Sequence, residues 1–149
     1  MRDPMSIARA EEKDAFVVAV VAVIVRDDPD GARRVLAMRR AATKDAGAGI
    51  WETCSGRLEA DEQPIDAVTR EVREETGLEV RVDATPIDAY AMRRRERPMA
   101  LIVYRAAWIA GEVRRSDEHD AHAWWTLAEV EASPMPTRLV EAVKRALAR

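Results

Sequence analysis

Acidic side chains crowd one short segment, GRLEADEQPIDAVTREVREETGL, which covers residues 56–78. Clustered carboxylates at the edge of a protein core attract a hard cation, because such cations prefer oxygen ligands. The segment therefore indicates a metal site. Its glutamates are Glu59, Glu62, Glu71, Glu74 and Glu75.

The second half of this segment predicts an amphipathic helix over residues 64–76. Pro64 suits a first helical position, and Gly77 suits the left-handed residue just past a helix. At about 100° per residue, the helix has one stripe that should face a sheet, with three glutamates roughly a quarter turn away. These acids would border the core. The stripe consists of Ile65, Val68, Val72 and Thr76.

Charge alone does not separate a metal site from a solvated helix face. Glu71 and Glu75 stand at i and i+4, and such a like-charged pair costs only about 0.2–0.5 kcal/mol when exposed. The joint spacing is more specific, because its seven fixed positions coincide by chance on the order of once in ten million starts. Those positions are Gly56, Glu62, Arg70, Glu71, Glu74, Glu75 and Gly77.

This pattern resembles the Nudix box, the signature of the Nudix hydrolases, and matches it at every defining position. The order of elements around it is similar to the family's α/β/α sandwich, from about Phe16 to the C-terminus. The resemblance implies hydrolysis of a pyrophosphate bond in a nucleoside diphosphate linked to another moiety, with Mg²⁺ or Mn²⁺. Cations would neutralise the phosphate oxygens and lower the pKa of the water that attacks phosphorus.

The resemblance also assigns roles within the box. It implies Glu71, Glu74 and Glu75 as metal ligands, and Glu71 or Glu74 as the acceptor of the water proton. Arg70 would brace a neighbouring carboxylate. The carbonyl of Ser55 is a further expected metal ligand.

Outside the helix, relatives often take an additional acidic ligand or base from a late loop, where Glu118 is our choice against the alternative of a solvated loop. Arginines near the strand ends that flank the site would hold phosphates. The basic turn at 93–97 is the other option, although such turns are typical of an exposed sheet edge. The expected substrate contacts are Arg57, Arg39, Glu59 and Glu62.

Two positions depart from the family's pattern, since Ser55 and Asp61 stand where many relatives have glycine. Any residue at position 55 retains its carbonyl, and aspartate tolerates the left-handed backbone conformation better than most residues. We therefore expect an altered loop geometry around an intact site.

Four aromatic residues invite comparison with base-stacking platforms, but aromatic residues make up only 5% of the chain and are needed mainly for its core. Consecutive Trp124 and Trp125 should not both point inward if they lie on a strand. The other two are Trp51 and Tyr90.

Histidine and cysteine chemistry is less favoured. His119 and His122 are expected to be surface or packing residues, because a zinc site needs further partners. Cys54 is expected to be a buried inert thiol. Isopentenyl diphosphate isomerases share the Nudix fold and use a cysteine near this strand, but their box diverges whereas this one is complete.

The elements around the box predict an α/β fold, a sandwich with a mixed central sheet. One domain is expected at 16–149, after a flexible N-terminal tail at 1–15. A final amphipathic helix would have Thr137 as its cap. The expected strands are 16–25, 33–40, 49–56, 79–83, 87–92 and 101–110, with a mixed aromatic segment at 121–127.

Composition bounds the partners. A net charge of −3 gives no overall attraction to nucleic acid or to an anionic membrane. The most apolar run, at 16–25, has half the length that spans a bilayer. One cysteine excludes an internal disulfide, which fits the cytoplasm. Dimers are common among relatives, so the resemblance also allows a homodimer.

The substrate is left open between several small nucleotides. Arg94 stands where ADP-ribose and dinucleoside polyphosphate hydrolases often carry proline or tyrosine, so neither subclass is supported. The remaining candidate is a single-domain hydrolase of nucleotides, including damaged nucleoside triphosphates. The alternatives are a nucleotide-sensing module that retains the fold without turnover, and the isomerase.

Overall fold

The computed structural model describes residues 4, 15–43 and 47–149. The predicted flexible tail, 1–15, therefore lies outside the described residues apart from positions 4 and 15. Within the described ranges, none of the helices combines the length and the apolar character that crossing a membrane requires.

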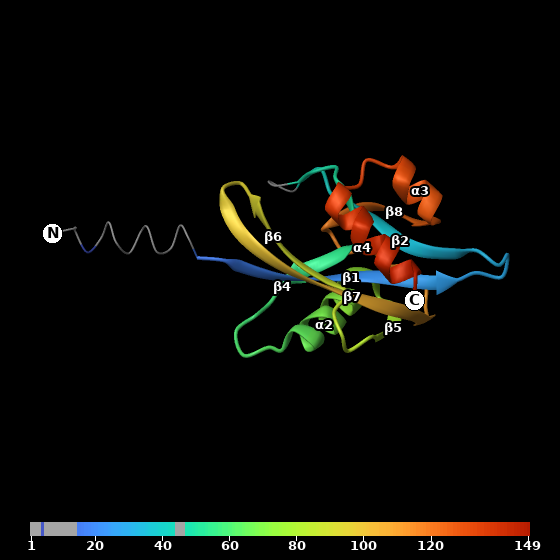
Figure 1. The fold of residues 1–149 in the computed structure, drawn as a ribbon, viewed down its shortest axis with the longest axis horizontal. Helices are drawn as coiled ribbons and strands as arrows, with labels where there is room; N and C mark the ends of the chain where they lie inside the picture. The colour runs from blue at the N-terminus through green and yellow to red at the C-terminus, as the bar shows by residue number, and fades with distance from the viewer. Residues whose placement is uncertain (1–3, 5–14, 44–46) are drawn as a thin grey trace.

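A mixed sheet of eight strands forms the central layer, with helices on both of its faces (Figure 1). Helix α2 (Pro64–Thr76) packs against one face. Helices α3 (Leu127–Ala132) and α4 (Thr137–Leu147) cover the other. The predicted α/β sandwich is confirmed.

The long strand β1 lies at the centre of the sheet. It pairs in parallel with β7 and antiparallel with β2 and β4. Strands β5 and β6 pair with β7, and β3 and β8 pair with β2. The strands are β1 (Val17–Asp27), β2 (Arg33–Arg40), β3 (Trp51–Glu52), β4 (Cys54–Arg57), β5 (Glu79–Val82), β6 (Asp88–Arg94), β7 (Arg97–Ala110) and β8 (His119–Trp125).

Strand β1 is buried on both faces, which explains its nearly continuous apolar sequence. Val20 and Ile24 pack into the cluster beneath α2, whereas Val21 and Val23 pack into the cluster beneath α4. Such burial is expected to stabilise the fold by about 1.5–3 kcal/mol for each large apolar side chain. The strand is therefore a rigid platform for the residues that its neighbours carry.

The box helix forms where the sequence predicts it. Val68 and Val72 of the predicted stripe are buried against the sheet, and Ile65 packs at the edge of the same cluster. Gly77 ends the helix with a φ of 70°, and its N–H donates to the carbonyl of Arg73 at 3.0 Å. This packing fixes the rotation of α2 about its axis, and with it the directions in which the glutamates point.

The segment predicted as one strand at 49–56 is in fact two strands. Strand β3 pairs with β2, and β4 pairs with β1, so the chain changes partner at Thr53. A hydropathy pattern cannot show this change of pairing, because burial continues across it from Glu52 to Cys54.

The C-terminal elements also differ in detail from the prediction. Thr137 is the first residue of α4 rather than its cap, and Pro136 occupies the capping position. A short helix, α3, was not predicted. Thr126 and Glu129 close a capping box at its start, a pattern that the sequence does carry.

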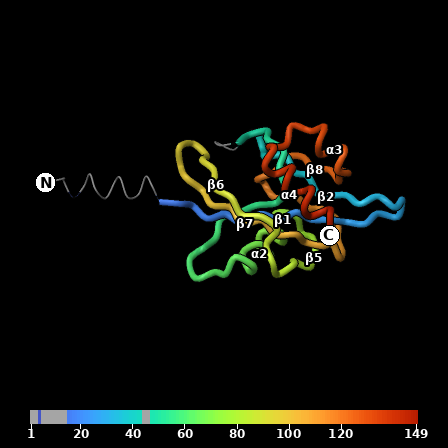
Figure 2. The backbone as a smooth tube through the Cα atoms, viewed as in Figure 1, coloured from blue at the N-terminus to red at the C-terminus, as the bar shows by residue number. Residues whose placement is uncertain are grey.

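A two-residue turn joins β6 to β7. Arg95 and Glu96 have φ values of 49° and 63°, which is the geometry of a tight turn that matches the twist of a hairpin. Figure 2 shows this hairpin tip in yellow and the loop before α2 in green, both at the end of the molecule where β1 begins. The basic segment is therefore held close to the box.

Substitution of Gly77 tests how strongly the end of α2 depends on the left-handed conformation. A Cβ at this position would meet no atom closer than 3.4 Å, so Gly77→Ala should lower the free energy of unfolding through backbone strain alone, by about 1–2 kcal/mol. Gly77→Asn should lose less, because asparagine tolerates this conformation. Urea denaturation measures both, and equal losses would contradict this explanation.

Candidate active site

Arg70, on the outer side of α2, gathers the acidic residues of the box. Its Nε and Nη2 donate to both oxygens of Glu62, at 2.7 and 3.0 Å. Its Nη1 donates to Glu71 at 2.8 Å and to Glu74 at 3.2 Å. Its Nη2 also donates to the carbonyl of Arg57 at 3.2 Å. One guanidinium thus ties the helix to the loop and to the end of β4.

The loop before α2 folds back over the helix. Asp61 has a φ of 65°, the left-handed conformation that the sequence led us to expect there. The N–H of Glu59 donates to Glu62 at 3.2 Å. The guanidinium of Arg70 beside Glu62 lowers the pKa of that carboxyl below its ordinary value. Glu62 therefore serves to hold the loop.

Glu71 lies directly against the backbone of β4. A Cβ built at Gly56 would come within 2.0 Å of the carboxyl carbon of Glu71, which is far inside the contact distance. Only glycine leaves room for this carboxylate. Glu71 is therefore the reason that this position of the box requires glycine.

Glu75 is the most deeply buried acid of the box, with 3% of its surface exposed. The thiol of Cys54 donates to Oε2 at 3.1 Å, and Oε1 has no hydrogen-bond partner. Burial above all, together with the hydrogen bond with Glu118 and the charges of Glu118 and Glu71, raises the pKa of Glu75 to about 9, against the effect of Cys54. Among the described residues, the contacts found for this carboxyl, with Cys54 and Glu118, bring it no positive charge.

Glu71 shares this environment. Burial raises the pKa of its carboxyl, against the effect of Arg70, and the charges of Glu74 and Glu118 add to the rise. Three carboxyl groups, those of Glu71, Glu75 and Glu118, thus crowd one another at the edge of the core. A divalent cation is the kind of group that this set of oxygens fits, because it would favour their ionised forms.

Glu74 is placed differently from the other acids. Its side chain is 58% exposed and bonds Arg70 at 3.2 Å. Among the described residues, no three acidic, histidine or cysteine side chains form a ready-made metal cage. Like charges repel, so each acid takes the nearest donor instead. A ligand role for Glu74 stays a prediction.

A charged cavity of about 790 Å³ opens beside these acids. Glu71, Glu118 and Glu59 line it, together with Ser55 and Gly56. Most of its remaining polar lining is arginine. Those residues are Arg40, Arg57, Arg94, Arg95 and Arg97.

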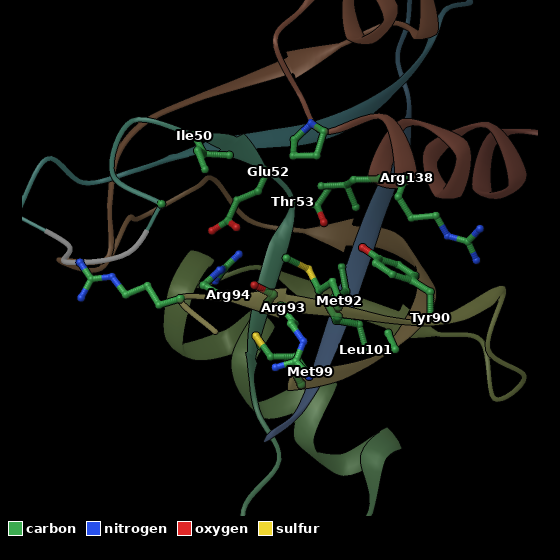
Figure 3. Close-up of a pocket in the computed structure, with 18 residues that line it drawn as sticks. Ile50, Glu52, Thr53, Tyr90, Met92, Arg93, Arg94, Met99, Leu101 and Arg138 are labelled. Carbon is green, nitrogen blue, oxygen red and sulfur yellow. The ribbon is translucent and has the colours of Figure 1, made fainter. Parts of the chain in front are cut away.

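An apolar cavity of about 740 Å³ adjoins the charged one. Both are lined by Ser55, Met99, Arg94 and Arg95. Figure 3 shows methionine and leucine side chains on one side of it and Tyr90 with Arg138 on another. The guanidinium carbon of Arg138 lies 4.9 Å from the Tyr90 ring centre. The two cavities together suit a ligand with one flat apolar end and one anionic end.

The expected substrate contacts are only partly brought together. Arg57 and Glu59 line the charged cavity. Glu62 does not, because Arg70 holds it behind the loop. Arg39 lines neither cavity and bonds Asp120 at 2.7 Å.

Of the two arginines that we chose, only Arg57 reaches the charged cavity, and the other arginines that line it were not chosen. Arg40 follows Arg39 at the end of β2, and successive strand residues point to opposite faces. Arg94, Arg95 and Arg97 reach it because the hairpin overhangs the box. The sequence feature that could have identified them is the basic turn RRRERP.

All four aromatic residues pack against the core, as predicted. Trp125 lies against Trp51, with ring centres 4.6 Å apart. Trp124 packs on the opposite face, where Arg26 lies 3.9 Å from its ring centre. Both tryptophans of the pair point inward, because helices cover both faces of the sheet; our expectation that they could not was wrong. Tyr90 packs at the same core and also lines the apolar cavity.

His119 and Cys54 are buried, as expected of packing residues. Nε2 of His119 lies 3.0 Å from Oε1 of Glu52. His122 lies 2.8 Å from the guanidinium of Arg115. Burial raises the pKa of the Cys54 thiol, and the charge of Glu75 raises it further, so the thiolate is disfavoured.

Glu75 should make the stability of the metal-free protein depend on pH. Its folded pKa of about 9 lies above its ordinary value of 4.5, so the folded chain keeps a proton that the unfolded chain releases. The associated stability is fully present below about pH 4.5 and is lost as pH rises through about 9. In EDTA, urea midpoints should fall over this range. Glu75→Gln should flatten the fall, and the exposed control Glu131→Gln should not; identical slopes in all three would contradict the assignment.

Comparison with known proteins agrees with this geometry. The NUDIX domain family matches residues 15–148. A MutT-like protein from Streptomyces ambofaciens is 39% identical over 113 residues, which cover 76% of this chain and 66% of that protein. The CTP pyrophosphohydrolase of Escherichia coli (strain K12) is 32% identical over 122 residues, which cover 80% of this chain and 83% of that protein.

The crystal structure of a MutT protein from Methanosarcina mazei Go1 superimposes with a TM-score of 0.78 at 24% identity, and the match covers 91% of this chain and 95% of that one. The fold is thus shared well beyond the box, and the family resemblance of the sequence is confirmed. The chain belongs to the NUDIX family of hydrolases.

Proposed function

We propose that this chain hydrolyses a pyrophosphate bond of a nucleoside triphosphate with the help of Mg²⁺ or Mn²⁺. The observation that carries the proposal is the charged cavity, where Glu71 and Glu118 meet a set of arginines. Carboxylates on one side suit metal ions, and arginines on the other suit phosphate oxygens. The relatives reported above, a MutT-like protein and a CTP pyrophosphohydrolase, point the same way.

The metal would be held by Glu71 and Glu75. Both are crowded carboxyl groups with raised pKa values, chiefly from burial. Further ligands would be Glu118, Glu74 and the carbonyl of Ser55. When bound, the cation would neutralise phosphate oxygens and lower the pKa of the attacking water.

The chain's own residues would supply orientation and proton transfer. Glu71 or Glu74 would take the proton of the attacking water, and the burial that raises the pKa of Glu71 makes its carboxylate the stronger base. Arg70 would keep Glu71 in place through its 2.8 Å bond. The arginines of the β6–β7 hairpin would hold the outer phosphates, and the apolar cavity would hold the nucleoside.

The isomerase alternative is weakened by the position of Cys54. This residue is 1% exposed, and it lines neither cavity. A catalytic thiol must reach its substrate. The sensing module remains the second candidate, since its fold and cavities would be the same.

The remaining partner proposals follow from composition and from the family. We expect a small nucleotide as the substrate and a cytoplasmic location, with no nucleic acid or membrane partner. A homodimer stays a prediction.

Turnover tests the proposal directly. Incubation with Mg²⁺ and a panel of nucleoside triphosphates, nucleotide sugars, ADP-ribose and dinucleoside polyphosphates should release nucleotide products, with a triphosphate turned over best. Glu71→Gln should reduce kcat/KM about 100-fold or more, because it removes a metal ligand and a proton acceptor. Asp66→Asn, an exposed change on the same helix, should not. Binding of a nucleotide without product would favour the sensing module and contradict the enzyme.

Gly56→Ala tests the position of Glu71 without changing any charge. The new methyl group would overlap the Glu71 carboxyl, whose carbon lies 2.0 Å from the Cβ position. A displacement of about 1 Å can reduce turnover about 100-fold. Asp66→Asn, the exposed change on α2, is again the control. Steady-state kinetics on folded variants measures the effect, and unchanged kcat in Gly56→Ala would place Glu71 outside the reaction.

A further inference from the structure

The apolar cavity contains one buried carboxylate, that of Glu52 at the end of β3. The residue is 7% exposed although it lines the cavity. Figure 3 shows its carboxylate in the wall between Ile50 and Thr53. An acid is unusual in such surroundings, because burial of a charge is unfavourable unless partners stabilise it.

Two side chains, those of His119 and Arg40, contact the carboxylate of Glu52, and both contact the same oxygen, Oε1. Nε2 of His119 lies 3.0 Å from Oε1, and Nη1 of Arg40 lies 3.4 Å from it. These contacts fix the carboxylate and balance its charge. They leave Oε2 as the oxygen that can accept a hydrogen bond from an occupant of the cavity.

A second polar group lies beside Glu52. Thr53 is 1% exposed and lines the same cavity, and its Oγ1 is buried without a hydrogen-bond partner. Consecutive residues of a strand point to opposite faces. Here the change of partner between β3 and β4 at Thr53 lets both residues line one cavity. A buried hydroxyl without a partner indicates that a ligand completes its bonding.

We propose that Glu52 and Thr53 select a nucleobase with an amino group next to an unprotonated ring nitrogen, which means cytosine or adenine. The proposal rests on the hydrolase activity proposed above and names the base that its cavity takes. Oε2 of Glu52 would accept from the amino group, and the hydroxyl of Thr53 would donate to the ring nitrogen.

Uracil and hypoxanthine present the opposite pattern at this edge. Each has a carbonyl oxygen where cytosine or adenine has the amino group, and an N–H at the adjacent ring position. The carbonyl would face the Glu52 carboxylate, and two acceptors repel each other. A site built in this way rejects the mismatched base because buried polar groups would be left unpaired.

Matched substrate pairs test this selection. CTP and UTP differ at this edge with the ring size unchanged, and so do ATP and ITP. In the wild-type protein, kcat/KM should favour the amino member of at least one pair. In Glu52→Gln, the amide can donate to the carbonyl, so the amino-to-oxo ratio should fall about tenfold or more. The exposed control Glu131→Gln should keep the wild-type ratio.

Binding separates this proposal from the hydrolase activity. Calorimetric titration with CMP and UMP in EDTA needs no turnover. If no nucleotide is hydrolysed but CMP binds better than UMP, the hydrolase fails and the base selection stands. Thr53→Val is the second variant, should Glu52→Gln not fold, and it should weaken CMP binding more than UMP binding. An unchanged amino-to-oxo ratio in a folded variant overturns the proposal, because a purely structural Glu52 would alter both substrates equally.

Discussion

The candidate site depends on one electrostatic constraint. Its glutamates place negative charge at the edge of the core, and a guanidinium group neutralises that charge only on the outer side of α2. Arg70 faces the outer carboxylates and binds Glu62, Glu71 and Glu74. Glu75 lies inward, where burial above all raises its pKa to about 9 and where the thiol of Cys54 donates to it. The folded chain therefore tolerates its innermost acid chiefly as the neutral form. A divalent cation bound there would change that balance, so its binding would depend on pH.

The fold serves this constraint by close packing. Strand β1 is buried on both faces and holds β4 in register, so that Gly56 meets Glu71 at a distance no other residue allows. The same end of the sheet carries the β6–β7 hairpin, whose arginines face the acids across the charged cavity. The apolar cavity continues from there along the sheet. The acids, the arginines and the apolar lining thus follow one another, in the order that a metal ion, phosphates and a nucleoside require.

The sequence predicted most of the fold and named Glu71 and Glu118, which line the charged cavity; the roles of these acids stay predictions. The helix at 64–76 was readable because proline and glycine mark its ends and one apolar stripe runs along it. The arginines of the site were harder to predict. Successive side chains of a strand point to opposite faces, so a shift of one residue in the strand end decides whether Arg39 or Arg40 faces the cavity. The break at Thr53 was also hidden, because it is a change of partner between two buried strands. As a consequence of this break, Glu52 and Thr53 line the same cavity, which the sequence alone could not show.

The central claim is that the buried acids form a site for a divalent cation. A crystal structure of the protein grown with Mn²⁺ tests it most directly, because anomalous scattering locates the ion without ambiguity. The account predicts Mn²⁺ bound by carboxylate oxygens of Glu71 and Glu75, beside the charged cavity. Mn²⁺ bound elsewhere, with Glu75 still bonded only to Cys54 and Glu118, would contradict it.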